Sequence, residues 1–171
     1  MQKIISSAKL KGVFTVVHKD RHGKILSREE FENLVTNEGF DYLLDASLHG
    51  STAISDWYFA PWTTNTAVAV TQTYASPGNT EVTTAIDEST RQAWGEGASS
   101  GQSVTNATAA TITANTDVTV YGCGIVGGGS AATTKGNTAG GGTLLATALF
   151  SSSKVLANGE TLDLTYTISK A

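Results

Sequence analysis

The sequence contains very little cysteine. Cys123 is the only cysteine among 171 residues. A single cysteine cannot form a disulfide within the chain, and it cannot supply the several thiolates of a cysteine-based zinc site. We therefore expect packing or assembly, rather than cross-links, to stabilise the fold.

Basic residues are also few and scattered. The chain has 11 lysines and arginines against 15 aspartates and glutamates, a net charge of −4. Most cations occur before residue 92, and the later ones, Lys135, Lys154 and Lys170, are isolated. A nucleic-acid groove needs clustered Lys and Arg to displace counterions, so we expect no nucleic-acid partner.

Long apolar runs are absent. No stretch approaches the roughly 18 uninterrupted apolar residues of a membrane-spanning helix. Met1–Leu10 carries two lysines and lacks the apolar centre of a signal peptide. We expect no membrane partner and synthesis in a soluble compartment.

Gly, Ser, Thr, Ala and Val dominate what is present, while charged residues make up only 15% and long helix-forming runs are nearly missing. This composition is typical of β-proteins. Lys11–Asp20 and Lys24–Phe31 predict an opening hairpin around the turn residues Arg21–Gly23. Ile54–Trp62, with four aromatic residues, predicts a buried strand that leaves its sheet near Pro61.

Further strands are expected in the second half of the chain. Val104–Thr113 and Asp117–Val126 alternate like the strands of a second hairpin, with a turn at Asn115. Leu144–Ser151 and the stripe Leu162–Ile168 follow, the latter introduced by an Asn-Gly turn. Between these strands, residues 63–84 predict either short strands or an irregular excursion, and residues 95–103 and 127–142 predict flexible glycine-rich loops.

One segment changes to a helical period. The apolar residues at helical spacing are Phe40, Leu43, Leu44 and Leu48. Thr36 or Asn37 can cap the start and Gly50 can end the helix, which predicts a helix over Asn37–His49.

Together these elements predict an all-β fold, an antiparallel β-sandwich with one short α-helix near residues 37–49. A jelly roll is one strand arrangement compatible with the pattern, and the strand order stays open. Residues 1–10 are expected to form an N-terminal arm, and residues 11–171 a single β-sandwich domain.

Gly122–Gly127 matches the G-x-G-x-x-G pattern of dinucleotide-binding loops. That chemistry requires a helix to begin at the motif, but Gly128 and Gly129 continue into a glycine-rich loop, and the first acidic residue downstream is Glu160. We interpret the motif as a glycine-rich strand or bulge and expect no cofactor.

The three histidines are candidates for metal ligands and for catalytic bases. His18 and His22 have H-x-x-x-H spacing, but they flank a predicted turn, so two solvated turn histidines are the favoured interpretation. His49 could partner a serine or an aspartate, but no G-x-S-x-G elbow is present. We predict no catalytic, cofactor-binding or metal-binding residues, and a protein that is not an enzyme.

Four side chains are candidates for contacts with a partner. Trp94 is surrounded by polar residues and followed by a flexible loop, so an interface anchor and a core residue are equally consistent with its position. Arg91 lies three residues before it in the sequence. Trp57 and Trp62 could stack on sugars or bases, although core packing is the favoured interpretation.

A family resemblance covers most of the chain, from about Lys11 to Ser169. Asn33–Gly39 (NLVTNEG), followed by Leu43-Leu44-Asp45, resembles the opening of small structural proteins of tailed bacteriophages, of the capsid decoration or cement type. Later landmarks of that group match in order. These are Trp57-Tyr58, Ser89–Trp94, a glycine-rich patch before Leu144–Phe150, and Asn158–Leu162 before an alternating C-terminal strand.

The resemblance implies a virion protein, made in the host cytoplasm and located on the capsid surface. It implies that the major capsid protein is the partner and that the chain stabilises the shell as a homo-oligomer, for which a trimer is one arrangement. The alternative is a tail, neck or fibre component that binds a glycan or a receptor, for example through Trp94 or the aromatic residues of Ile54–Trp62.

Overall fold

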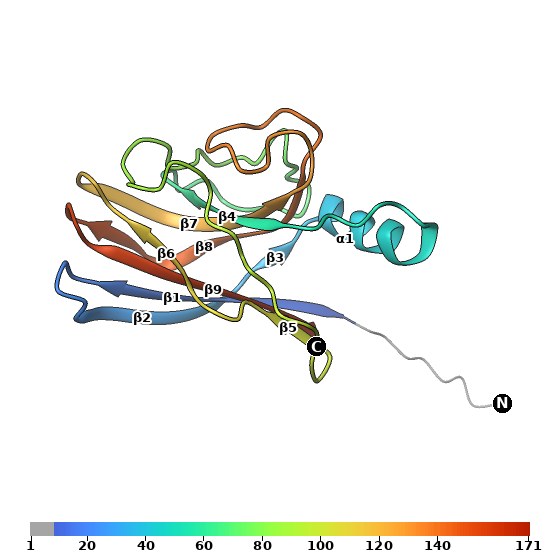
Figure 1. Ribbon diagram of the computed structural model, residues 1–171, viewed down its shortest axis with the longest axis horizontal. Coiled ribbons are helices and arrows are strands. Elements are labelled where there is room, and N and C mark those ends of the chain that lie inside the picture. Colours follow the sequence, from blue (N-terminus) through green and yellow to red (C-terminus); the bar gives the residue numbers. More distant parts are fainter. Residues whose placement is uncertain (1–8) are drawn as a thin grey trace.

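The computed structural model describes residues 9–171 as two antiparallel sheets packed face to face, with one helix projecting from one end (Figure 1). The first sheet contains β1 (Leu10–Lys19), β2 (Ile25–Glu32), β5 (Ser103–Thr105), β6 (Ala110–Thr113) and β9 (Thr161–Lys170). The second contains β3 (Leu34–Val35), β4 (Trp57–Trp62), β7 (Val118–Gly127) and β8 (Thr143–Leu156). The predicted all-β sandwich with a single short helix is confirmed.

The strand order, which the sequence left open, is β2-β1-β9-β5 in the first sheet, where β6 also pairs with β9, and β3-β8-β7-β4 in the second. The predicted N-terminal arm, residues 1–10, falls almost wholly outside the described residues, and Leu10 already belongs to β1. No helix among the described residues is long and apolar enough to cross a membrane.

The centre of the first sheet shows how alternation builds the core. Phe14 and Val16 on β1 lie opposite Tyr166 and Leu164 on β9, and all four side chains are fully buried. The rings of Phe14 and Tyr166 lie 4.7 Å apart. Because successive side chains of a strand point to opposite faces, this period-2 stripe covers the inner face and leaves the polar residues between them outside.

The predicted second hairpin is wrong. β6 pairs with β9 in the first sheet, whereas β7 pairs with β8 and β4 in the second, so the chain crosses between sheets near Asn115. Backbone hydrogen bonds fix this crossing, since Asn115 N–H donates to Ala85 O at 3.1 Å and Gly159 N–H to Ala114 O at 2.7 Å. A hairpin and a crossing between sheets produce the same alternation in sequence, so the pattern could not separate them.

The glycine motif lies within β7, and the predicted glycine-rich strand with bulges is confirmed. The register between β7 and β8 shifts between Val120 and Gly122 and again between Ile125 and Val126. At Gly124, an added Cβ would lie 2.5 Å from the ring of Trp62. Only glycine therefore allows the tryptophan on β4 to pack against this strand without displacement.

The helical segment runs over the predicted range, as α1 (Asn37–Leu44) followed by a π turn, η1 (Asp45–His49). Thr36 caps its start by accepting a hydrogen bond from Gly39 N–H, and Gly50 ends it with φ of 75°. Gly39 lies directly on β8, because an added Cβ would approach the backbone of Leu145 to 2.5 Å. This close approach fixes which face of the helix meets the sandwich.

Candidate functional site

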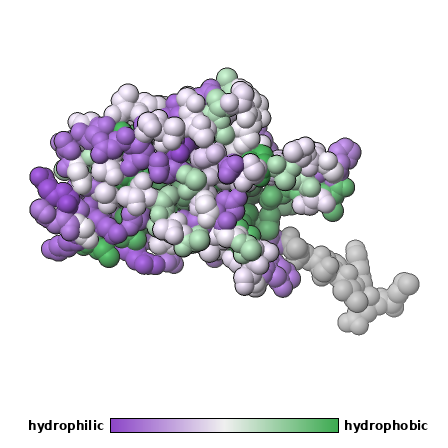
Figure 2. Space-filling model, in the orientation of Figure 1, coloured by the Kyte–Doolittle hydropathy of each residue, from purple (hydrophilic) through white to green (hydrophobic). Residues whose placement is uncertain are grey.

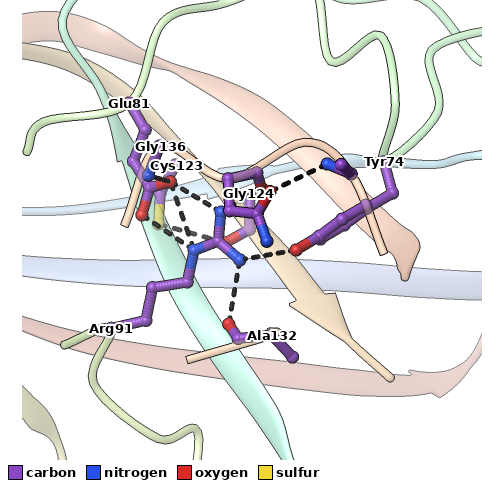
Figure 3. Close-up of polar contacts among 9 residues, drawn as sticks. Tyr74, Glu81, Arg91, Cys123, Gly124, Ala132 and Gly136 are labelled. Atoms are coloured by element: carbon purple, nitrogen blue, oxygen red, sulfur yellow. Dashed lines mark hydrogen bonds and ion pairs between the residues drawn. The ribbon is translucent and has the colours of Figure 1, made fainter. Parts of the chain in front are cut away.

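The most elaborate polar cluster of the described residues surrounds Arg91, beside the edge strand β4 of the second sheet (Figure 3). Its guanidinium donates to the Glu81 carboxylate at 2.7–3.2 Å, to the Tyr74 hydroxyl at 3.1 Å, and to the carbonyls of Ala132 at 2.8 Å and Asn137 at 3.0 Å. These bonds engage all three nitrogens, and Arg91 therefore has no N–H group left for a ligand.

Glu81 is equally engaged, since it also accepts a hydrogen bond from Gly136 N–H at 2.7 Å. The two charged side chains are only 3% and 4% exposed. Burial would lower the pKa of Arg91, but the hydrogen bonds and charge of Glu81 outweigh it, so the pKa of Arg91 is raised and its guanidinium stays charged.

The cluster joins two segments whose structure the sequence could not predict. Residues 63–84 form the irregular excursion, one of the two predicted alternatives, and carry Tyr74 and Glu81. Residues 127–142, predicted to be a flexible loop, carry the carbonyls and the amide that bind the ion pair. The arrangement is a structural clamp that holds both segments on the sandwich.

A hollow of about 500 Å³ adjoins this clamp. Trp62, Tyr74, Pro77 and Asn79 are among its lining residues. The buried Asn79 amide is used within the chain, because its oxygen accepts from Thr66 N–H at 2.9 Å and its nitrogen donates to Thr66 O at 2.9 Å. We see no convergence of free polar groups there that would orient a ligand.

The structure places all four sequence-predicted interface residues in the interior. Trp57, Trp62, Arg91 and Trp94 are between 2% and 6% exposed. Trp94 donates its Nε1–H to the carbonyl of Tyr166 at 2.8 Å. None of these side chains forms an exposed surface of the described chain.

His18 is not the solvated turn residue that the sequence predicted. It lies on β1, is 8% exposed, and its Nε2 lies 2.9 Å from the Glu160 carboxylate. The hydrogen bond from Ala157 N–H, followed by that from His18, lowers the pKa of Glu160. His22 lies on the exposed turn and His49 at the end of the helical segment, and no group of three or more His, Cys, Asp or Glu able to hold a metal occurs among residues 9–171.

Cys123 lies in the middle of β7 and is fully buried. Burial raises the pKa of its thiol, which keeps the sulfur protonated and unreactive. After Gly127 the chain continues as a loop, so no helix N-terminus faces the glycine motif.

The surface offers a more distinctive feature, an apolar stripe on the projecting helix. Phe40 and Leu44 are 45% and 44% exposed, and Leu48 is 82% exposed. They follow each other at four-residue spacing and therefore share one side of the helix. Figure 2 shows hydrophobic residues on this projection and in the recess at its base. We call Phe40, Leu44 and Leu48 the helix patch.

The helix patch is bordered by acidic and apolar groups. Asp41 and Asp45 each follow a residue of the helix patch directly in sequence, and both are exposed. A hollow of about 610 Å³ separates Phe40 from Leu10 at the start of β1, and Lys9 also lines this hollow. The sequence predicted the helix and its apolar residues. The residues of the helical segment that pack against the core are Tyr42 and Leu43, and not those of the helix patch.

A second apolar feature occurs at the tip of the first hairpin. Ile25 and Leu26, at the start of β2, are 57% and 50% exposed. The adjoining turn carries Arg21 and Lys24, both exposed. We call Ile25 and Leu26 the hairpin patch. It lies at the opposite end of the long axis from α1 in Figure 1.

Comparison with known proteins adds no family to these observations: no protein-family model matches the chain, and no curated protein matches it.

Proposed function

We propose that this protein is a structural protein of a tailed-bacteriophage virion that binds the exterior of the assembled capsid as a decoration or cement protein. Its partner is the major capsid protein, and it is synthesised in the host cytoplasm. Its role is mechanical, because contacts that span neighbouring capsid subunits resist the pressure of packaged DNA. The proposal includes self-association of the bound copies.

The observation that carries the proposal is the distribution of exposed apolar side chains on a stiff sandwich. Among the described residues, five of eight exposed large hydrophobic side chains belong to the helix patch or the hairpin patch. Exposed apolar groups gathered at particular sites are typical of protein–protein contacts. Patches at both ends of one rigid body suit a protein that links neighbouring molecules.

The clamp around Arg91 supports the same role. It fixes the two long irregular segments with buried hydrogen bonds instead of leaving them free. A rigid body loses little conformational entropy when it docks, so more of its contact energy is retained as binding energy. The resemblance of Asn33–Gly39 and the later landmarks supports the capsid setting.

Co-sedimentation with empty shells of the major capsid protein tests the proposal. We expect the full-length chain to pellet with shells, to saturate at a fixed ratio to capsid subunits, and to raise the temperature at which the shells disrupt. Isolated tails and soluble glycan serve as controls. Binding to tails or glycan but not to shells would contradict the proposal and favour a tail, neck or fibre component.

A further inference from the structure

We propose that the helix patch of one copy binds the hairpin patch of a second copy, so that the chain associates head to tail. The surfaces are complementary in both polarity and charge. This inference goes beyond capsid binding, because it names the surfaces through which copies contact each other and can be tested without any shell.

The helix side of the contact is apolar and acidic. The apolar stripe of the helix patch runs beside Asp41 and Asp45, which are one helical turn apart, about 6 Å. Among residues 9–171, neither aspartate forms an ion pair. The sequence contains no lysine or arginine between Arg28 and Arg91, so the helix supplies no compensating cation.

The hairpin side is apolar and basic. The turn is closed by Asp20 N–H donating to Lys24 O at 2.9 Å, and the Asp20 carboxylate accepts from the N–H groups of His22 and Lys24. Lys19 pairs with Asp163, but Arg21 and Lys24 form no ion pair within the described part of the chain. The turn therefore carries two cations against the single carboxylate of Asp20, which leaves a net positive charge beside the exposed hairpin patch.

The geometry makes the contact intermolecular. The β1–β2 hairpin and α1 lie at opposite ends of the molecule in Figure 1, so one copy cannot bring its own two patches together. Figure 2 shows strongly hydrophilic residues gathered at the end opposite the helix. A contact between two different patches on identical chains is heterologous, and it closes into a ring or extends into a row.

Charge also argues against a symmetric pairing of two helix patches. Such a pair would bring Asp41 and Asp45 of both copies together around an apolar contact, and like charges at an interface oppose association. The hairpin patch brings two cations instead, and its two large aliphatic side chains can cover apolar surface that Phe40, Leu44 and Leu48 leave in water.

Sedimentation velocity over a range of protein concentrations at low salt tests the contact. We expect the full-length chain to self-associate. We expect Asp41→Lys with Asp45→Lys, or Arg21→Glu with Lys24→Glu, to weaken association about tenfold or more, which corresponds to about 1.4 kcal/mol. Leu48→Ser should also weaken association, because it removes apolar surface from the helix patch. The chain should still fold, because Leu48 is 82% exposed.

The decisive variant combines all four charge reversals, which exchanges the signs of the two patches. We expect it to associate within about threefold of the natural sequence, as coupled pairs behave in a double-mutant cycle. Asp56→Lys with Asp87→Lys, two exposed positions outside both patches, is the control for net charge and should change little.

A chain that stays monomeric at all concentrations would overturn the inference. So would a combined variant that associates no more tightly than the two double variants. Association strengthened by reversing Asp41 and Asp45 would point instead to a symmetric helix contact. Capsid pelleting by a purely monomeric chain would leave the proposed function standing while removing this contact.

Discussion

Replacing Arg91 with methionine is expected to lower the free energy of unfolding by about 3–5 kcal/mol, because Glu81 would retain a buried charge without its cation. Glu81 is 4% exposed, and its carboxylate accepts from Arg91 and from Gly136 N–H. The carbonyls of Ala132 and Asn137 would also lose their donors. Urea unfolding followed by tryptophan fluorescence measures the change.

The matched control is the double variant Arg91→Met with Glu81→Gln. Removing both charges avoids a buried unpaired carboxylate, so we expect the double variant to be more stable than Arg91→Met alone, with a coupling energy of about 1–3 kcal/mol. Equal stability of the single and double variants, or a loss below about 1 kcal/mol for Arg91→Met, would show that the clamp does not hold the two segments.

Replacing Trp94 with alanine is expected to cost about 3–5 kcal/mol of stability, the usual cost of removing a large core side chain. Its ring lies 5.2 Å from that of Tyr166, and its Nε1–H satisfies the Tyr166 carbonyl. Thermal and urea unfolding would both show the loss. Trp94→Phe keeps most of the volume but not the donor, and it should lose about 1–3 kcal/mol.

This pair of variants separates two interpretations that the sequence could not. Truncating a core residue lowers the stability of the whole protein. Truncating an interface anchor that is exposed in the free chain would weaken partner binding with little change in the free energy of unfolding. A Trp94→Ala variant within about 1 kcal/mol of the natural chain would therefore contradict the buried position. The sequence around Trp94 is polar, and its burial results from contact with β9, which is distant in sequence.

The local features of the fold could be predicted because they depend on neighbouring residues. The ends of the helix follow from the hydroxyl of Thr36 and from Gly50, and the last strand follows from strict alternation after an Asn-Gly turn. β7 could be recognised as a strand despite its glycines because no helix signal follows Gly127.

Long-range features could not be predicted. The sequence does not show that the chain crosses from the first sheet to the second after β6, that His18 meets Glu160, or that Arg91 reaches Glu81. Each of these features depends on the packing of distant segments. The helix patch is exposed because Gly39 approaches Leu145 closely. This contact places the side of the helix that carries Gly39 against the core and leaves the helix patch outside. The proposed contact surfaces therefore emerged only from the folded chain.

We propose that the chain decorates the capsid exterior and that its copies meet end to end there. An electron cryomicroscopy reconstruction of the virion tests it most directly. We predict density for the two-sheet sandwich repeated over the capsid lattice, with the helix end of one copy against the β1–β2 hairpin of the next. Density confined to the neck, tail or fibres would contradict the account.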